Sequence, residues 1–176
     1  MTAVNFLYGD ITELTLDEVR YDGGRIGGIV RPFIIVENDR EVESIVEDEV
    51  VDYIKNIKIK ELDKEMNQRV AEGFSSESTG YFFAYGAEQQ AEFTQTLTLI
   101  SAGLYFDDFV EWRTLDVGVV TLSLDEFKTV MIEGNAYKRA WTVKYREVVD
   151  NIKQMTNDTC KMSSLKAISL GTSPDE

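Results

Sequence analysis

The stretch Ser123–Met155, SLDEFKTVMIEGNAYKRAWTVKYREVVDNIKQM, decides the fold. Ser123 lies three residues before Glu126, the spacing of a capping box, so a helix is predicted to begin here. Apolar side chains then recur every three or four residues, as on the buried face of a helix. They are Phe127, Val130, Met131, Tyr137, Trp141, Tyr145, Val148, Ile152 and Met155. Gly134 interrupts the run, and we expect it to kink or split the helix.

The last part of this run follows heptad spacing. Its members Trp141, Tyr145, Val148, Ile152 and Met155 lie four, three, four and three residues apart. Two repeats are too few to establish a coiled coil. We expect the stripe to pack first in the chain's own core, and any excess apolar length to pack between chains.

A second long helix is predicted for residues 38–73. Asn38-Asp39 can cap it, apolar residues recur at helical spacing as far as Val70, and Gly73 follows as a stop signal. Its first half carries more acids than the positive end of a helix dipole requires. We therefore interpret it as a docking helix. The residues expected to bind a partner are Val42, Val46, Val50 and Tyr53 here, with Trp112, Trp141, Tyr145, Val148 and Ile152 later in the chain.

Residues 74–157 are predicted to form a helix, hairpin and helix domain that packs on this long helix. A helix beginning at about Ala87 places Phe93, Leu97, Ile100 and Leu104 on one stripe. The segment Phe109–Leu122 alternates around Trp112 and contains a turn near residues 116–118, which indicates a β-hairpin.

The two ends of the chain have a different character. Residues 1–37 alternate short apolar runs with glycine-containing turns, which predicts a small N-terminal β unit for attachment. Residues 158–176 lose the helical periodicity and are predicted to be an exposed tail. Together these elements predict an α+β fold.

Composition narrows the function. Lysine and arginine total 18 against 32 aspartates and glutamates, a net charge of -14, so nucleic acid and anionic membranes are poor partners. Histidine is absent and there is one cysteine, which removes the usual proton-transfer group and any thiolate cluster. We expect no enzyme activity, no metal and no cofactor. The beginning of the sequence lacks the pattern of a signal peptide, which predicts synthesis in a cytoplasm.

Two patterns suggest chemistry and are weighed against simpler readings. The glycine-rich stretch Asp22–Gly28 is followed by Ile29 and Val30, where a phosphate-binding loop needs lysine and a hydroxyl, so we interpret it as turns. Adjacent acids such as Asp107 and Asp108 could serve in glycoside hydrolysis, but acidic residues are too numerous for a catalytic pair to be singled out.

Aromatic residues gather on both sides of the predicted second helix. They are Tyr81, Phe82, Phe83, Tyr85, Tyr105, Phe106, Phe109 and Trp112. Large aromatics dominate domain cores, so most are expected to be buried. The open alternative is that they line a sugar-binding groove or a partner interface.

Four segments between Ile57 and Ile152 have a familiar residue order. They read IKIKELDKEMNQRVAEGF, YGAEQQAEF, FVEWRTLDVGVVTLSLDEF and NAYKRAWTVKYREVVDNI. This order resembles an uncharacterised domain family of bacteriophage genomes, found in proteins encoded beside or appended to tail-fibre and tail-fibre-assembly genes. The resemblance brings no catalytic residues with it.

What the resemblance implies is a role in a virion or in its assembly. The expected function is a structural protein of the phage tail, in the fibre or baseplate, that docks onto other tail or fibre subunits. Its expected location is the virion tail after synthesis in the host cytoplasm. We also expect a homo-oligomer, for which the symmetry of phage fibres favours a trimer. The alternatives are a tail-fibre assembly chaperone that caps the fibre, and a carbohydrate-binding or glycan-cleaving module.

Overall fold

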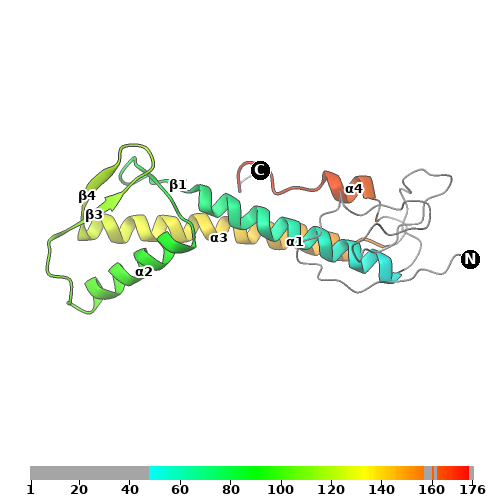
Figure 1. Cartoon of the computed structure of the whole chain (residues 1–176), viewed down its shortest axis with the longest axis horizontal. Coiled ribbons are helices and arrows are strands. Elements are labelled where there is room, and N and C mark those ends of the chain that lie inside the picture. Colours follow the sequence, from blue (N-terminus) through cyan, green and yellow to red (C-terminus); the bar gives the residue numbers. More distant parts are fainter. Residues whose placement is uncertain (1–47, 157–159, 161, 175–176) are drawn as a thin grey trace, which may run out of the picture. The chain divides into compact units, whose positions relative to one another are not determined.

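The computed structural model describes residues 48–156, 160 and 162–174. The predicted β unit of residues 1–37 lies outside the described residues, as do Val42 and Val46. The elements in chain order are α1 (Asp48–Glu72), β1 (Phe74–Ser75), β2 (Phe82–Phe83), α2 (Ala87–Ser101), β3 (Phe109–Arg113), β4 (Val119–Ser123), α3 (Leu124–Gln154) and α4 (Met162–Ala167) (Figure 1). Helices combined with two small antiparallel sheets, β1–β2 and β3–β4, confirm the α+β class.

The chain divides into two compact units. Unit 1 comprises Met1–Lys64 with Tyr145–Ser173, and unit 2 comprises Glu65–Lys144 with Pro174–Glu176. Both α1 and α3 contribute residues to each unit. The predicted segments were divided at residues 73 and 157, whereas the units divide inside α1 and α3. A single long helix can contribute residues to two hydrophobic cores, so the ends of helices do not mark the limits of the units.

Unit 1 corrects the expectation of an exposed tail at residues 158–176. The core of this unit contains Ile54, Ile57, Leu62, Val149, Ile152, Cys160, Leu165 and Leu170, all buried. Three of these residues belong to the expected tail, and Leu165 lies in α4. A six-residue helix is too short to show an amphipathic period, so the sequence pattern gave no sign of it.

The end of α3 is capped in unit 1 by a buried lysine. The Lys55 ammonium group donates hydrogen bonds to the backbone carbonyls of Lys153 at 3.3 Å and Met155 at 2.5 Å. The last carbonyls of a helix have no partner within it and carry partial negative charge. Lys55 therefore satisfies groups that would otherwise be left unpaired at the end of α3.

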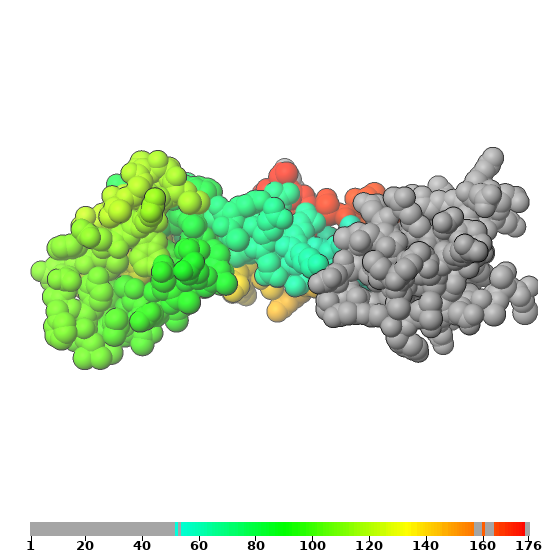
Figure 2. Space-filling model, in the orientation of Figure 1, coloured from blue at the N-terminus to red at the C-terminus, as the bar shows by residue number. Residues whose placement is uncertain are grey.

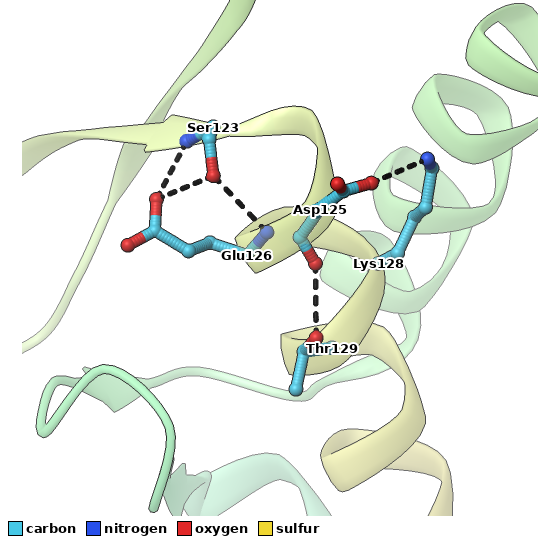
Figure 3. A network of polar contacts seen from close by, with 5 residues as sticks. All are labelled: Ser123, Asp125, Glu126, Lys128 and Thr129. Atoms are coloured by element: carbon cyan, nitrogen blue, oxygen red, sulfur yellow. Dashed lines mark hydrogen bonds and ion pairs between the residues drawn. The ribbon is translucent and has the colours of Figure 1, made fainter.

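The beginning of α3 has the predicted capping box (Figure 3). The Glu126 amide donates to the Ser123 hydroxyl at 3.2 Å, and the Ser123 amide donates to the Glu126 carboxylate at 2.8 Å. Beside the capping box, Lys128 forms an ion pair with Asp125 of the first turn at 2.8 Å. These contacts satisfy free backbone groups at the helix start, which confirms the prediction that the helix begins here.

Glycine at position 134 does not split α3, which is one helix from Leu124 to Gln154. A β-carbon added at Gly134 would lie 2.5 Å from the Tyr85 ring and 3.0 Å from the Phe74 ring. The two rings are themselves packed edge to face at 5.4 Å. The glycine is therefore explained by the close approach of aromatic rings to the helix backbone.

Of the two other predicted helix ends, the end of α1 at Gly73 is confirmed and the extent of α2 is not. Gly73 follows α1 with a positive φ of 98°, and a β-carbon there would overlap the Phe83 carbonyl oxygen. The stripe predicted for α2 is too long, because the helix ends at Ser101 and Leu104 lies beyond it. Within α2, Phe93 is buried, whereas Leu97 and Ile100 are only half-buried.

Replacing Gly134 with alanine tests the aromatic packing. In an exposed helix this change would stabilise the protein by about 1 kcal/mol. Here the new methyl group meets two rings, so we expect Gly134→Ala to lower the free energy of unfolding by roughly 1–3 kcal/mol, measured by urea denaturation. Gly134→Ala should cost less in a Tyr85→Leu background than in the wild type, because one of the two rings is then absent. A stabilised Gly134→Ala variant would contradict the packing.

Candidate functional site: the β3–β4 hairpin

Aromatic packing fixes the hairpin to the rest of unit 2. The Phe93 ring of α2 stacks on the Trp112 ring of β3, with centroids 4.1 Å apart and planes 22° apart. Phe127 of α3 lies 5.4 Å from both of these rings. The half-buried indole is therefore held between two helices, and β3 has a fixed position relative to both.

The hairpin confirms the prediction for Phe109–Leu122. β3 and β4 pair antiparallel, with Val110 opposite Leu122 and Trp112 opposite Val120. Val110 and Leu122 are buried, whereas the alternate β3 residues Phe109, Glu111 and Arg113 are exposed. One face of the hairpin thus packs on the core and the other faces solvent.

The turn between the strands is tied to β2. The Leu115 amide donates to the Phe82 carbonyl at 2.8 Å, and the Phe82 amide donates to the Asp116 carboxylate at 3.1 Å. Asp116 also accepts a hydrogen bond from the Val117 amide at 3.0 Å. The predicted turn at residues 116–118 is therefore confirmed, and two hydrogen bonds tie its first side to Phe82.

These contacts perturb the Asp116 carboxyl group. Desolvation alone would raise its pKa, but hydrogen bonds from the Thr114 hydroxyl and from the amides of Asp116, Phe82 and Val117 together hold that pKa below its usual value. Hydrogen bonds to the charged form favour ionisation. Asp116 is accordingly a negatively charged clamp on the β2 backbone at neutral pH.

A pocket opens along the edge of β3. Its volume is about 440 Å³, and its walls are Ala84, Gln89 and Glu92 on one side and residues 111–115 on the other. Successive strand residues point to opposite faces of a sheet. Because five consecutive residues line this pocket, it is the edge of the strand that borders it rather than either face.

The charged side chains at this edge are unpaired in the part of the chain that the structure describes. No hydrogen bond or ion pair joins the side chain of Glu92, Glu111 or Arg113 to another described residue. The chemistry available is therefore recognition by two carboxylates, one guanidinium and part of an indole. Nothing in this set resembles a nucleophile with its base.

Large apolar side chains are exposed on the hairpin and on the segment that leads into it. Their exposed fractions are 58% for Leu104, 91% for Phe106, 46% for Phe109, 59% for Leu115, 61% for Val117 and 67% for Val119. Figure 2 shows this segment, bright green to yellow-green, on the visible face of unit 2. Exposed large apolar side chains that gather on one element mark candidate interaction sites.

The structure corrects part of the predicted partner-binding set. Trp141 is 1% exposed and Ile152 is fully buried, so both belong to cores of the chain itself. Tyr145 and Val148 are half-buried, as is Trp112. The heptad positions Trp141 and Ile152 are therefore buried within the chain itself and are not available to a partner helix. Val50 and Tyr53 lie in α1, but their side chains lie outside the described residues.

The aromatic residues near α2 divide between core and surface. Phe83 and Tyr85 are buried, Phe106 and Phe109 are exposed, and the other four are half-buried. The expectation that most of the eight are buried is therefore wrong. The acids Asp107 and Asp108 do not line the pocket at β3, where Glu92 and Glu111 lie instead. Sequence reasoning missed these two and Arg113, although the alternation Glu111-Trp112-Arg113 in a predicted strand was a usable signal.

No cluster of three or more potential metal-ligating side chains occurs among the described residues. No described helix combines the length and apolar character needed to cross a membrane.

Acidification tests the Asp116 clamp. A group whose pKa is depressed in the folded state contributes stability above its unfolded pKa and loses it as the pH falls through the folded value. We expect the Phe82 and Val117 amide resonances to shift together on acidification in NMR spectra, and to lose this response in Asp116→Ala. Asp108→Ala, at an exposed position, is the matched control. An unchanged response in Asp116→Ala would refute the clamp.

Comparison with known proteins gives a family. No curated protein and no solved structure matches the chain. Residues 53–164, more than half of the 176 residues, match the family described as Domain of unknown function (DUF4376). The four segments quoted above all lie inside this range. The chain therefore belongs to the DUF4376 family.

Proposed function

We propose that this protein is a non-enzymatic docking protein of a bacteriophage tail, a fibre or baseplate component that binds other tail subunits. The observation that carries the proposal is Phe106, whose side chain is 91% exposed. An isolated exposed leucine or valine is ordinary, but a fully exposed phenylalanine in an apolar segment is not. Phe106 has Leu104 and Phe109 as exposed neighbours in that segment.

The way this segment is held supports docking. It connects α2 to β3, and the Phe93–Trp112 stack holds these two elements together. An exposed aromatic side chain on a connection with fixed ends loses little conformational freedom on binding, so less of the interaction energy is spent on ordering. Aromatic residues are enriched in the cores of protein interfaces for the related reason that they bury a large area with few rotatable bonds.

The side-chain inventory supports the non-enzymatic part of the proposal. The sequence contains no histidine, and its single cysteine, Cys160, is fully buried. Burial raises the pKa of the Cys160 thiol, with Lys55 acting in the opposite direction, and a thiol in that state is a poor nucleophile. A net charge of -14 favours a partner with a basic surface.

The tail is proposed as the location because of the resemblance of residues 57–152 to a domain encoded beside tail-fibre genes. In that setting the binding partner is the product of a neighbouring tail gene. A structural component stays in the mature particle at a fixed ratio to its partner. An assembly chaperone is instead needed for the fibre to fold.

Substitution of Phe106 tests the docking surface. We expect Phe106→Ser to weaken binding to the neighbouring fibre subunit by about tenfold or more, as for an interface anchor. Its thermal unfolding should be unchanged, because the side chain is exposed. Ile132→Ser, at a position of α3 that is 69% exposed, is the matched control and should bind normally. Binding is measured by calorimetry with purified proteins.

Two results would count against the proposal. Equal binding by both variants would exclude the Phe106 segment as the docking surface. Absence of the chain from purified virions, found by mass spectrometry, would exclude a structural component. In that case co-expression separates the remaining roles: a fibre subunit that stays insoluble without this chain identifies a chaperone.

A further inference from the structure

The hydrogen-bond pattern of the hairpin determines which backbone groups of β3 are free. The Thr114 amide donates to the Gly118 carbonyl at 2.7 Å, so the backbone of Thr114 faces β4. Backbone direction alternates along an antiparallel strand. Trp112 therefore also faces β4, whereas Glu111 and Arg113 direct their N–H and C=O groups away from it. Leu115 fits the alternation, because its amide donates outward to Phe82.

At one end of the outward edge of β3 the backbone is already hydrogen-bonded to β2, and next to that end it is not. Leu115 is paired with β2, but no hydrogen bond outside the β3–β4 ladder joins the backbone of Glu111 or Arg113 to another described residue. The pocket of about 440 Å³ lies alongside this part of the edge, where a neighbouring strand would have to enter. Unpaired edges of this kind are templates for strand addition.

We propose that the edge of β3 pairs with the same edge of a second copy of this chain, antiparallel and centred on Trp112. This register sets Glu111 opposite Arg113 of the partner subunit, and the twofold axis repeats the pair. It also sets Phe109 opposite Leu115 of the partner subunit. Opposite charges and apolar side chains that face each other across strands stabilise a sheet.

The backbone pattern agrees with this register. Glu111 and Arg113 both face outward, so each forms a hydrogen-bonded pair with its counterpart, giving about four new backbone hydrogen bonds. Trp112 faces Trp112 of the partner subunit at the closer, non-bonded position. The pairing ends where Leu115 is already bonded to Phe82. A continuous four-stranded sheet, β4–β3–β3–β4, results.

The charges explain why a second copy is favoured over an unrelated strand. Charged residues on an edge usually prevent association, because a neighbouring strand must bury or repel them. Here the two charges have opposite sign and lie two residues apart, so an antiparallel copy neutralises both. The apolar residues beyond them, Phe109 and Leu115, are 46% and 59% exposed in the single chain and become covered. A twofold pair follows, rather than the trimer that the resemblance favours.

A charge exchange tests this pairing in the full-length protein. In Glu111→Arg the two copies would bring arginines together, and in Arg113→Glu they would bring glutamates together. We expect each variant alone to dimerise at least about tenfold more weakly than the wild type in sedimentation experiments. An equimolar mixture of the two variants should regain the dimer, because each then meets its opposite charge. Glu77→Arg and Arg139→Glu are matched controls at exposed positions and should dimerise normally.

The mixture distinguishes edge pairing from a loss of folding, because misfolded chains would not recover on mixing. A wild type that is monomeric at high concentration, or a trimer, overturns the proposal. So does a mixture that remains monomeric, or variants that dimerise as strongly as the wild type. Phe106→Ser should leave the dimer intact, so failure of the docking proposal and failure of this one give separate results.

Discussion

The contact between Phe93 and Trp112 is the constraint on which the hairpin depends. The Phe93 ring also lies within 6.3 Å of Phe83 and 6.0 Å of Tyr85, so one side chain of α2 meets aromatic residues from β2, β3 and the segment between them. Such ring pairs stabilise beyond the area they bury. This packing uses the inner face of the hairpin and leaves its outer face and the edge of β3 for other partners.

Much of unit 2 was predictable because its signals are local. The capping box at Ser123, the alternation around Trp112 and the stop at Gly73 each depend on residues close together in the chain, and each is confirmed. Gly134 was misread because its reason is distant: the rings that reach it belong to Phe74 and Tyr85, which lie 60 and 49 positions earlier in the sequence.

Two of the predicted partner-binding residues are buried for a related reason. Periodicity indicates that Trp141 and Ile152 are buried but not which surface buries them, and here it is the chain itself. The burial of residues in the C-terminal segment was missed because two leucines, Leu165 and Leu170, are too few to form a periodic pattern. The proposed pairing edge of β3 depends on Glu111 and Arg113 because their backbone N–H and C=O groups point away from β4. The number of charged residues in a sequence does not reveal the direction of backbone groups.

Two surfaces of unit 2 are proposed to bind partners: the exposed segment around Phe106 and the edge of β3. The proposal for the edge of β3 is the more specific, because it states both the register of pairing and the partner. Amide hydrogen exchange, measured residue by residue at low and high protein concentration, tests it most directly. The account predicts that the Glu111 and Arg113 amides become protected only at high concentration, while the Trp112 amide, bonded to β4, is protected at both. Equally fast exchange of the Glu111 and Arg113 amides at both concentrations would contradict it.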